Sequence, residues 1–450
     1  MLGIGLVLRS VRRLTALVLV SVAAALVQPL PAGAQAQEFR AFWVDAFHAG
    51  FKNSAQVTTL IATVREANCN AVVVEIRKRG DAYYTPDTGY ADYEPHATDT
   101  DPANFDSLAD LVGKAHDTSG GKARVEVHAW LVTWPIWGST TAPSNPQHPY
   151  NRHPEWLTQN TSGTTWNGNQ YCFDPGHPGA FEHTFRIAIS LVTNYDLDGI
   201  NFDYVRYAGN TWGYNPTAVS RFHARYGGSG NPLSTDPNWL QFRRDQVTAF
   251  VRKVYLNTIA RKPNVKVSAD TITWAPGPAN LSAWYASARA YHDVLQDWRA
   301  WMQEGILDLN IPMAYFNQAG SYTQDWTNWC DFIRDNQYGR HAVIGPGLYL
   351  NGTADAIRQM RYARTPSPSG NSVRGVCGYS YAVPDADSIP FGTFLQYLTS
   401  TPNAYDSVTP ALFAQPASIP AMPWKTSPAT GHLMGTVFSG AFGNAADGAV

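Results

Sequence analysis

The sequence predicts a (β/α)8 barrel, the TIM-barrel fold of the α/β class. From Phe39 onward, extended apolar runs alternate with helical patterns, and eight such runs occur. No hairpin signal joins one run to the next, so the strands should lie parallel. An open doubly wound sheet is the alternative, but residues 44–50 after the first run lack the glycine-rich phosphate loop typical of nucleotide-binding sheets of that kind.

The eight predicted strands are rich in valine, isoleucine and aromatic residues. Gly, Pro, Asn or Asp bounds each of them, as expected for strands that end in turns. They cover residues 39–47, 71–77, 124–132, 199–205, 266–272, 308–315, 341–350 and 375–382.

Amphipathic helical patterns separate these strands. The first begins at Ser54 and keeps Val57, Leu60, Ile61 and Val64 on one face. The expected helices cover residues 54–68, 105–116, 178–194, 239–260, 293–304, 323–335, 354–363 and 391–398.

The composition of the chain limits the kinds of molecule that it is expected to bind. Charged residues make up 15% of the chain and the formal net charge is −2, so no basic excess points to nucleic acid. We expect an uncharged substrate and no nucleic-acid partner. Aromatic residues reach 13%, with 15 Trp and 23 Tyr, which suits stacking on flat apolar faces such as sugar rings, although part of this load must be core.

The two ends of the chain differ in composition from the barrel region. Residues 1–36 combine three arginines, an apolar run at 14–27 and Ala34-Gln-Ala36, which predicts a secretory signal peptide cleaved after Ala36. No transmembrane segment is expected in the mature chain, whose barrel should cover residues 37–400. Residues 401–429 are predicted to be a linker or strap, and 430–450 the start of an incomplete β-sandwich or a disordered tail. Export permits disulfides, but the four cysteines leave three pairings open.

The fourth predicted strand carries the first candidate for chemistry. Ile200, Phe202 and Tyr204 should face the helices, while Asn201 and Asp203 should point into the barrel. In parallel barrels the reacting groups lie at the carboxyl ends of the strands, where Asp203 is expected. A structural aspartate that accepts backbone hydrogen bonds is the alternative.

Six short motifs, in order, resemble those of the glycosyl hydrolase-like 10 family of secreted bacterial barrels. The likeness covers roughly residues 38–398 and implies a TIM barrel with glycosidase activity on a polysaccharide. With the signal-like residues 1–36, we expect a bacterial protein that is secreted or lies in the periplasm or cell envelope. The motifs lie at residues 40–43, 75–84, 127–130, 174–178, 198–203 and 311–315.

Three positions depart from related patterns. Glu75 stands where the family more often has Gln, and the turn at residues 77–79 lacks a common Pro. The fourth strand also resembles the DxxDxDxE signature of chitinase-type barrels. Val205 occupies the place of its catalytic Glu, which disfavours chitinase chemistry.

Glycosidic bond hydrolysis usually needs two carboxyl groups, one as acid and one as nucleophile or base. Asp203 is the first candidate for nucleophile or base, and Asp270 or Glu75 for its acid partner, because all three are expected on inward faces near strand ends. Glu126 lies early in its strand, so we expect a structural ion pair there, with an arginine such as Arg40.

Ten further residues are candidates for substrate binding. Asp45, Asp81 and Asp174 could bind sugar hydroxyls, but capping of a turn explains each equally well. The inward His128 could donate to a sugar, and packing is the alternative. The remaining candidates are two arginines that could orient the carboxyls, Arg77 and Arg206, and four aromatic residues at strand ends, Trp130, Tyr207, Trp274 and Tyr315.

The sequence therefore predicts an exported glycoside hydrolase that cleaves O-glycosidic bonds of an envelope or plant-derived polysaccharide. No metal-ligand spacing stands out, so no metal or cofactor is expected. A carbohydrate-binding barrel without catalytic activity is the alternative. An ester or amide hydrolase is disfavoured because no GxSxG motif occurs.

Overall fold

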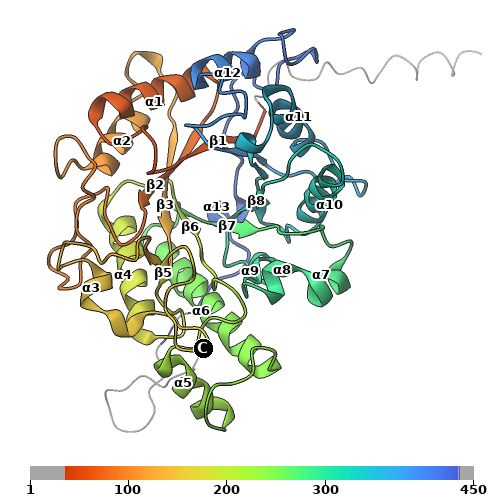
Figure 1. The fold of residues 1–450 in the computed structure, drawn as a ribbon. Coiled ribbons are helices and arrows are strands. Elements are labelled where there is room, and N and C mark those ends of the chain that lie inside the picture. Colours follow the sequence, from red (N-terminus) through yellow and green to blue (C-terminus); the bar gives the residue numbers. More distant parts are fainter. Residues whose placement is uncertain (1–35, 434, 436–450) are drawn as a thin grey trace, which may run out of the picture. The chain divides into compact units, whose positions relative to one another are not determined.

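The protein forms a parallel barrel surrounded by helices (Figure 1), as predicted. The computed structural model describes residues 36–433 and 435. Neighbouring strands follow the order β10-β8-β7-β6-β3-β2-β1-β11, and β9 also pairs with β8. Bridges between Ile344 and Val376 and between Gly347 and Tyr379 link the two ends of this order, so the barrel closes.

Most strands match the predicted ranges. Those at 71–77 and 266–272 agree at both ends, while the others are shorter by a few residues. The strands are β1 (Phe39–Val44), β2 (Ala71–Arg77), β3 (Glu126–Val132), β6 (Gly199–Asp203), β7 (Lys266–Ile272), β8 (Leu309–Ala314), β9 (His341–Ala342), β10 (Gly345–Pro346) and β11 (Gly375–Tyr379).

The seventh strand position is the main departure from the predicted strands. Residues 341–350 were expected to form one strand, but β9 and β10 are two short pieces followed by a 3₁₀ turn at Leu348–Leu350. Pro346 has no N–H to donate to a ladder, and Gly345 and Gly347 flank it, so the run cannot pair continuously.

Eight helices cover the barrel near the predicted ranges. Asp297 caps the helix expected at 293–304, which therefore begins only at Trp298. The helices are α1 (Ser54–Glu66), α2 (Ser107–His116), α4 (Pro178–Asn194), α6 (Pro237–Arg261), α9 (Trp298–Glu304), α10 (Tyr322–Asp335), α11 (Thr353–Ala363) and α12 (Phe391–Thr399).

The long loops at the carboxyl ends of the strands carry structure that the sequence did not indicate. Residues 133–174 contain a small antiparallel pair, β4 (Pro135–Trp137) with β5 (Tyr171–Cys172). Short helices occupy this and other loops, namely α3 (Pro149–Arg152), α5 (Pro216–Tyr226), α7 (Leu281–Ser287) and α8 (Arg289–His292).

The segment after residue 400 packs across the amino-terminal end of the barrel. Gln37, just before β1, bridges to Ser418, and Phe413 is fully buried. Helix α13 (Pro423–Thr426) is seen through the barrel opening in Figure 1, on its far side, and its Trp424 indole N–H donates to Asp308 at 2.7 Å. The predicted signal peptide, apart from Ala36, and most of the predicted sandwich start lie outside the described residues.

The fourth strand places its residues as expected up to Asp203. Ile200 and Phe202 pack in the layer between strands and helices, while Asn201 and Asp203 point inward. The expectation for Tyr204 is wrong: its φ is +51°, so the alternation reverses and Tyr204 belongs to the inner cluster. Val205 accordingly packs outward.

Candidate active site

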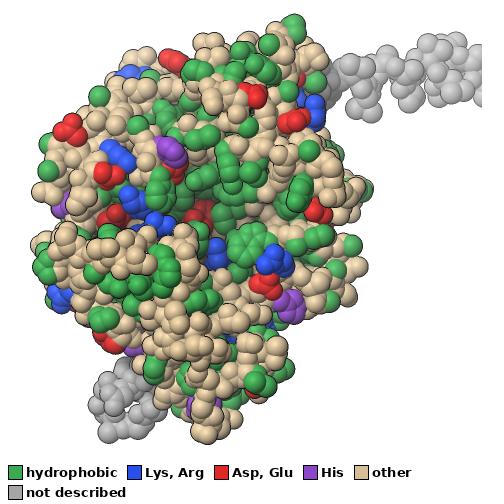
Figure 2. Space-filling view, viewed as in Figure 1, with side chains coloured by type: hydrophobic (Ala, Val, Ile, Leu, Met, Phe, Trp, Pro, Cys, Tyr) green, Lys and Arg blue, Asp and Glu red, His purple; other side chains and the backbone are tan. Residues whose placement is uncertain are grey.

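Three carboxyl groups meet in one cavity at the carboxyl end of the barrel. Glu75 comes from β2, Asp203 from the end of β6 and Asp270 from β7. All three line a cavity of about 240 Å³ together with aromatic side chains. Figure 2 shows this face, where acidic atoms lie inside a central hollow and basic side chains gather around it. The cavity unites the three residues predicted from sequence as acid or nucleophile.

Asp270 lines the cavity, and one of its oxygens is fixed by two donors. Its Oδ1 accepts the Trp43 indole N–H at 3.2 Å and the Asn201 amide at 3.0 Å. Burial raises the pKa of Asp270 well above its usual range, and the nearby charge of Asp203 raises it further. Asp270 therefore holds its proton more strongly than an exposed aspartate does.

Asp203 ionises more readily than Asp270. Burial raises its pKa to about 6, while the Arg206 charge and the Tyr204 N–H, which donates to Oδ1 at 2.6 Å, oppose that rise. Its backbone oxygen accepts both the N–H and the hydroxyl of Thr133, at 2.8 and 2.7 Å. At neutral pH Asp203 is the group that carries negative charge in this cavity.

Glu75 is almost fully buried, with 1% of its surface exposed. Its Oε2 accepts the Ala46 N–H at 2.7 Å. Burial raises its pKa well above the usual range in spite of this bond, and the charges of Asp45 and Asp203 act in the same direction. Glu75 is thus a second carboxyl that favours its proton.

None of the three carboxyls forms an ion pair within residues 36–433. One ionised carboxylate beside carboxyls that retain protons is the arrangement that acid–base catalysis requires. The alternative from sequence, an aspartate that accepts backbone hydrogen bonds, has one such bond in the structure, from the Tyr204 N–H to Oδ1, and Asp203 also lines the cavity together with Asp270.

A larger cavity of about 800 Å³ adjoins the first and shares Tyr204, Met313, Tyr315 and Tyr349 with it. Trp274 lines it with 37% of its surface exposed. The Arg206 guanidinium lies 4.4 Å from the Tyr204 ring centroid and 5.1 Å from that of Trp274. The wall of this larger cavity has aromatic faces and no carboxylate, which suits the stacking of sugar rings.

Four of the predicted substrate-binding residues therefore lie in the two cavities. Trp130 and Tyr315 line the smaller one, and Arg206, Trp274 and again Tyr315 line the larger. Tyr349 and Tyr379 were not predicted, although both follow or end strands and the same strand-end rule would have found them. Lys78, Arg79, Gln170 and Arg289 also line the cavities and carry no periodic signal in the sequence.

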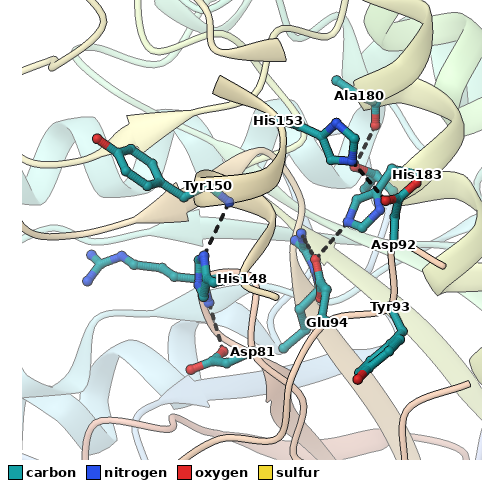
Figure 3. Close-up of polar contacts among 12 residues, drawn as sticks. Asp81, Asp92, Tyr93, Glu94, His148, Tyr150, His153, Ala180 and His183 are labelled. Atoms are coloured by element: carbon teal, nitrogen blue, oxygen red, sulfur yellow. Dashed lines mark hydrogen bonds and ion pairs between the residues drawn. The ribbon is translucent and has the colours of Figure 1, made fainter. Parts of the chain in front are cut away.

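Arg77 does not orient Glu75. A register shift between the two residues turns Arg77 out of the barrel, where its Nη2 lies 2.6 Å from Glu94 Oε1. Glu94 also bonds His183 of α4 at 3.0 Å (Figure 3). Burial alone would raise the pKa of Glu94, but Arg77 and His183 bring it to about 2. Arg77 belongs to a buried ion cluster between strand and helix.

Asp45 and Asp81 form turn caps outside the cavity lining. Asp45 Oδ1 accepts the N–H groups of Phe47 and His48 at 2.9 and 3.1 Å. Asp81 Oδ1 accepts those of Lys78 and Arg79, both at 3.0 Å. These are the backbone-capping bonds weighed as the alternative from sequence.

Asp174 and Tyr207 anchor loops beside the cavities. Asp174 is buried and accepts the Gly176 N–H at 2.8 Å and the Thr158 hydroxyl at 2.9 Å. The Tyr207 hydroxyl donates to Asp174 at 3.5 Å. Both residues fix the long loops that frame the site, and neither lines it.

His128 lies deep in the barrel beside Glu126. Its Nε2 is 3.2 Å from Glu126 Oε2, and Lys266 Nζ is 2.7 Å from Glu126 Oε1. The expectation that Arg40 pairs with Glu126 is wrong, because Arg40 pairs with Glu38 at 2.8 Å. Glu126 does form the structural ion pair expected of it, with a lysine.

Within residues 36–433, no group of three His, Cys, Asp or Glu side chains is placed to hold a metal ion, and no helix is long and apolar enough to cross a membrane. All four cysteines are buried and unpaired in this part of the chain.

The barrel is similar to solved glycoside hydrolase structures. The PgaB (BpsB) glycoside hydrolase domain from Bordetella bronchiseptica superposes with a TM-score of 0.58 at 15% identity, covering 82% of this chain and 100% of that one. The catalytic domain of β-amylase from Paenibacillus polymyxa gives 0.53 at 12% identity, over 77% and 93%. At these identities the likeness shows the fold.

Sequence relatives carry the comparison further. Glycosyl hydrolase YngK of Bacillus subtilis (strain 168) is 26% identical over 386 residues, which cover 81% of this chain and 68% of YngK. Glycosyl hydrolase DigH of Escherichia coli (strain K12) is 24% identical over 271 residues, 56% of each chain. The profile of the glycosyl hydrolase-like 10 family matches residues 38–348, from just before β1 to the turn after β10. Because this match spans well over half of the chain and seven of the eight strand positions, the protein belongs to the glycosyl hydrolase-like 10 family.

Proposed function

We propose that this protein is an exported glycoside hydrolase that cleaves O-glycosidic bonds of a polysaccharide by carboxylate acid–base chemistry. The observation that carries the proposal is the placing of Glu75, Asp203 and Asp270 around one cavity, buried and free of ion pairs within residues 36–433. A glycoside hydrolase family and fold agree with it.

The proposed roles follow from the order in which the carboxyls ionise. Asp203, with a pKa of about 6, carries the charge and acts as nucleophile or as the base that activates water. Asp270 favours its proton and acts as the acid that protonates the leaving oxygen. Its Oδ1 accepts two hydrogen bonds, which leaves Oδ2 as the oxygen that holds the transferable proton.

Glu75 is the alternative acid, because its pKa is raised as well. Its Oε2 is held by the Ala46 N–H, and Oε1 would carry the proton. Conversion of Asp270 and Glu75 to their amides, one at a time, separates the two: the variant of the true acid loses activity toward poor leaving groups while retaining it toward an activated aryl glycoside.

The two adjoining cavities support a polymeric substrate. The carboxyls line only the smaller cavity, whereas Trp274, Tyr349 and Tyr322 extend the aromatic lining through the larger one. Such a lining can stack several sugar rings on one side of the bond that is cleaved. Export in the mature form rests on the signal-like sequence of residues 1–36.

A non-catalytic carbohydrate-binding barrel is not favoured by any contact in this site. That function would leave the carboxyls free to pair with arginines, as Glu94 does with Arg77. Instead Arg206, whose charge acts on Asp203, bonds the Tyr207 carbonyl at 3.2 Å and lies over the Tyr204 ring.

Hydrolysis of a glycan panel tests the proposal. Purified plant polysaccharides and envelope glycans, peptidoglycan strands included, are incubated with wild type, with Asp203→Asn and with the matched control Asp236→Asn, which changes the aspartate that caps α6 outside the cavity. We expect reducing ends from wild type and control, and a rate about 10²–10⁴-fold lower for Asp203→Asn. Equal rates from wild type and Asp203→Asn would refute the role of Asp203.

A further inference from the structure

The basic side chains around the candidate active site differ in how their charges are matched. Those that line its two cavities are Lys78, Arg79, Arg206 and Arg289. Arg289 lies 2.5 Å from Asp293, and Lys78 lies 3.9 Å from Asp99. Within residues 36–433, Arg79 and Arg206 form no ion pair with any carboxylate. Two guanidinium charges on these walls therefore have no counterion.

Most hydrogen-bond donors of these two guanidiniums are also unused. Arg206 Nη1 donates to the Tyr207 carbonyl at 3.2 Å, and Arg79 Nε donates to the Gln170 side-chain oxygen at 3.3 Å. Arg206 Nε is buried and cannot be reached from the cavity. Arg206 Nη2 and both terminal nitrogens of Arg79 make no hydrogen bond within residues 36–433, and they keep accessible surface.

Arg65 shows what an arginine with a structural role does in this protein. It too has no ion pair in the described part of the chain, but it donates to four backbone carbonyls. Its charge is thus offset by carbonyl dipoles. Arg79 and Arg206 have no such set of acceptors, so a structural role leaves their accessible donors unexplained.

Both guanidiniums lie near Tyr204, which lines both cavities. The Arg206 guanidinium is 4.4 Å from the centroid of the Tyr204 ring. Burial and the charge of Asp203 raise the pKa of Tyr204, while the charges of Arg206 and Arg79 oppose that rise. Two like charges therefore lie near the place where the cavities join, and they repel each other unless an anion lies between them.

Asp203 does not serve as that anion. Burial raises its pKa to about 6 and the charge of Arg206 opposes the rise, yet Asp203 forms no ion pair with either arginine. Its Oδ1 instead accepts the Tyr204 N–H at 2.6 Å. In the proposed function Asp203 attacks the sugar or activates water, and a salt bridge to an arginine would oppose that role.

Aromatic contacts hold the two guanidiniums by their faces. Arg206 lies 5.1 Å from the Trp274 ring centroid as well as over Tyr204, and Arg79 lies 5.4 Å from the Phe47 ring centroid. A guanidinium that is held by its face keeps the N–H groups along its edge free. That edge matches the two oxygens of a carboxylate, with which it can form two parallel hydrogen bonds.

We propose that Arg79 and Arg206 bind a carboxylate of the substrate, so that the glycan on which this protein acts carries acidic sugar units. Cleavage of that glycan rests on the proposed function, whereas the carboxylate site rests on the two unpaired guanidiniums at the junction of the cavities. The proposal differs from the uncharged substrate expected from composition, because a net charge of −2 describes the whole chain and not the walls of one site.

The test compares pairs of glycans that differ only in charge. Each is used in its native form and after reduction of its carboxyl groups to alcohols. Oligogalacturonate and hyaluronan oligosaccharides carry the carboxylate on the sugar ring, and oligosaccharides of N-acetylmuramic acid carry it on an ether-linked lactyl group. Oligosaccharides of κ-carrageenan, which carry sulfate and no carboxylate, separate a carboxylate site from a general anion site.

Binding is measured by isothermal calorimetry on Asp203→Asn, which does not hydrolyse the ligand. Because this variant has no carboxylate at position 203, adding Arg206→Gln reports on the ligand and not on the pKa of Asp203. Arg79→Gln is added in the same way. Arg358→Gln is the matched control, because it removes an arginine that pairs with Asp355 on the surface of α11, away from both cavities. Thermal melting confirms that each variant is folded.

We expect at least one native glycan to bind about tenfold or more tightly than its reduced form, with a smaller difference at high salt. Arg79→Gln and Arg206→Gln should each weaken binding of the native form about tenfold and leave that of the reduced form nearly unchanged. Arg358→Gln should affect neither form. The glycan that responds shows whether the carboxylate is that of the ring or of the lactyl group.

Three results would overturn the inference. These are equal affinity for the two forms of every pair, tighter binding of the carrageenan than of any carboxylated glycan, and a preference for the native form that neither Arg79→Gln nor Arg206→Gln reduces. Hydrolysis of neutral glycans alone by wild type would overturn this inference and leave the proposed function intact. Preference for the native form without hydrolysis of any glycan would contradict the proposed function alone.

Discussion

Strand β2 carries two buried charged residues, two positions apart, with opposite surroundings. Glu75 points into the barrel toward Asp203 and Asp270, where no cation pairs with it among the described residues and burial raises its pKa. Arg77 points outward and pairs with Glu94. This pairing and the bond from His183 lower the pKa of Glu94 to about 2. The carboxyls that we propose for chemistry are left unpaired at a cost in stability, while the carboxyl of the buried ion cluster is matched to a cation.

Breaking the structural cluster should have the largest effect on stability. Glu94→Gln leaves the Arg77 guanidinium buried without its anion, so we expect a loss of about 3–5 kcal/mol in the free energy of unfolding at neutral pH. Because the folded pKa of Glu94 is depressed to about 2, its contribution is present above the unfolded pKa of about 4.3 and is lost as the pH falls toward 2. The deficit of the variant should therefore shrink across that window.

Urea unfolding of wild type and Glu94→Gln from pH 7 to pH 3 measures this. Glu304→Gln is the control, because Glu304 is partly exposed and pairs with Arg252 at 2.5 Å on the surface. It should cost about 0–1 kcal/mol. Similar losses in the two variants would mean that the Glu94 cluster is no more important than a surface pair.

Replacing a carboxyl in the cavity should raise the free energy of unfolding, in contrast to the loss expected for Glu94→Gln. The pKa of Asp270 is raised by burial and by Asp203, so ionisation of Asp270 destabilises the folded state. The stability contributed by the protonated Asp270 carboxyl is fully present below the unfolded pKa of about 3.9 and is lost as the pH rises toward the folded pKa. Asp270→Asn keeps the acceptor for Trp43 and Asn201 and avoids this loss, so we expect a gain of about 0.5–2 kcal/mol at pH 8 and almost none at pH 3.

Chemical denaturation of Asp270→Asn and of wild type at pH 3, 5 and 8 measures the difference in their free energies of unfolding. The same preparations, assayed on the glycan that wild type cleaves, should show that the more stable variant is the less active one. A variant that is less stable than wild type at pH 8 would contradict the view that Asp270 is retained for chemistry.

The capping aspartates should give the smallest effect. Asp81 accepts two backbone N–H groups, and Asn can accept the same bonds. We expect Asp81→Asn to change stability by less than about 0.5 kcal/mol and activity by less than about twofold. Melting temperature and initial rate check both values, and a large loss of rate with unchanged melting would place Asp81 in substrate binding after all.

Much of the barrel could be predicted because strand and helix patterns are local. The valine-rich run at 71–77 and the run at 266–272 agree with the structure at both ends. The inward direction of Asp203 followed from simple alternation. The break at residues 341–350 could have been read from Pro346, since a proline cannot donate within a ladder.

The site was only partly predictable because side-chain direction depends on single backbone irregularities. A positive φ brings Tyr204 into the cavity, and a register shift turns Arg77 away from it. Neither feature has a residue signature such as glycine at that position. Asp45, Asp81 and Asp174 were ambiguous for another reason, since the same residue type caps turns and binds sugars.

The pH dependence of kcat/KM tests the central claim most directly. If ionised Asp203 is the nucleophile or base, kcat/KM should rise with pH along a limb with an apparent pKa of about 6. Arg206→Gln removes the cation that lowers the pKa of Asp203, so its limb should move to higher pH. A wild-type profile without this limb, or a limb that Arg206→Gln leaves in place, would contradict the assignment of Asp203.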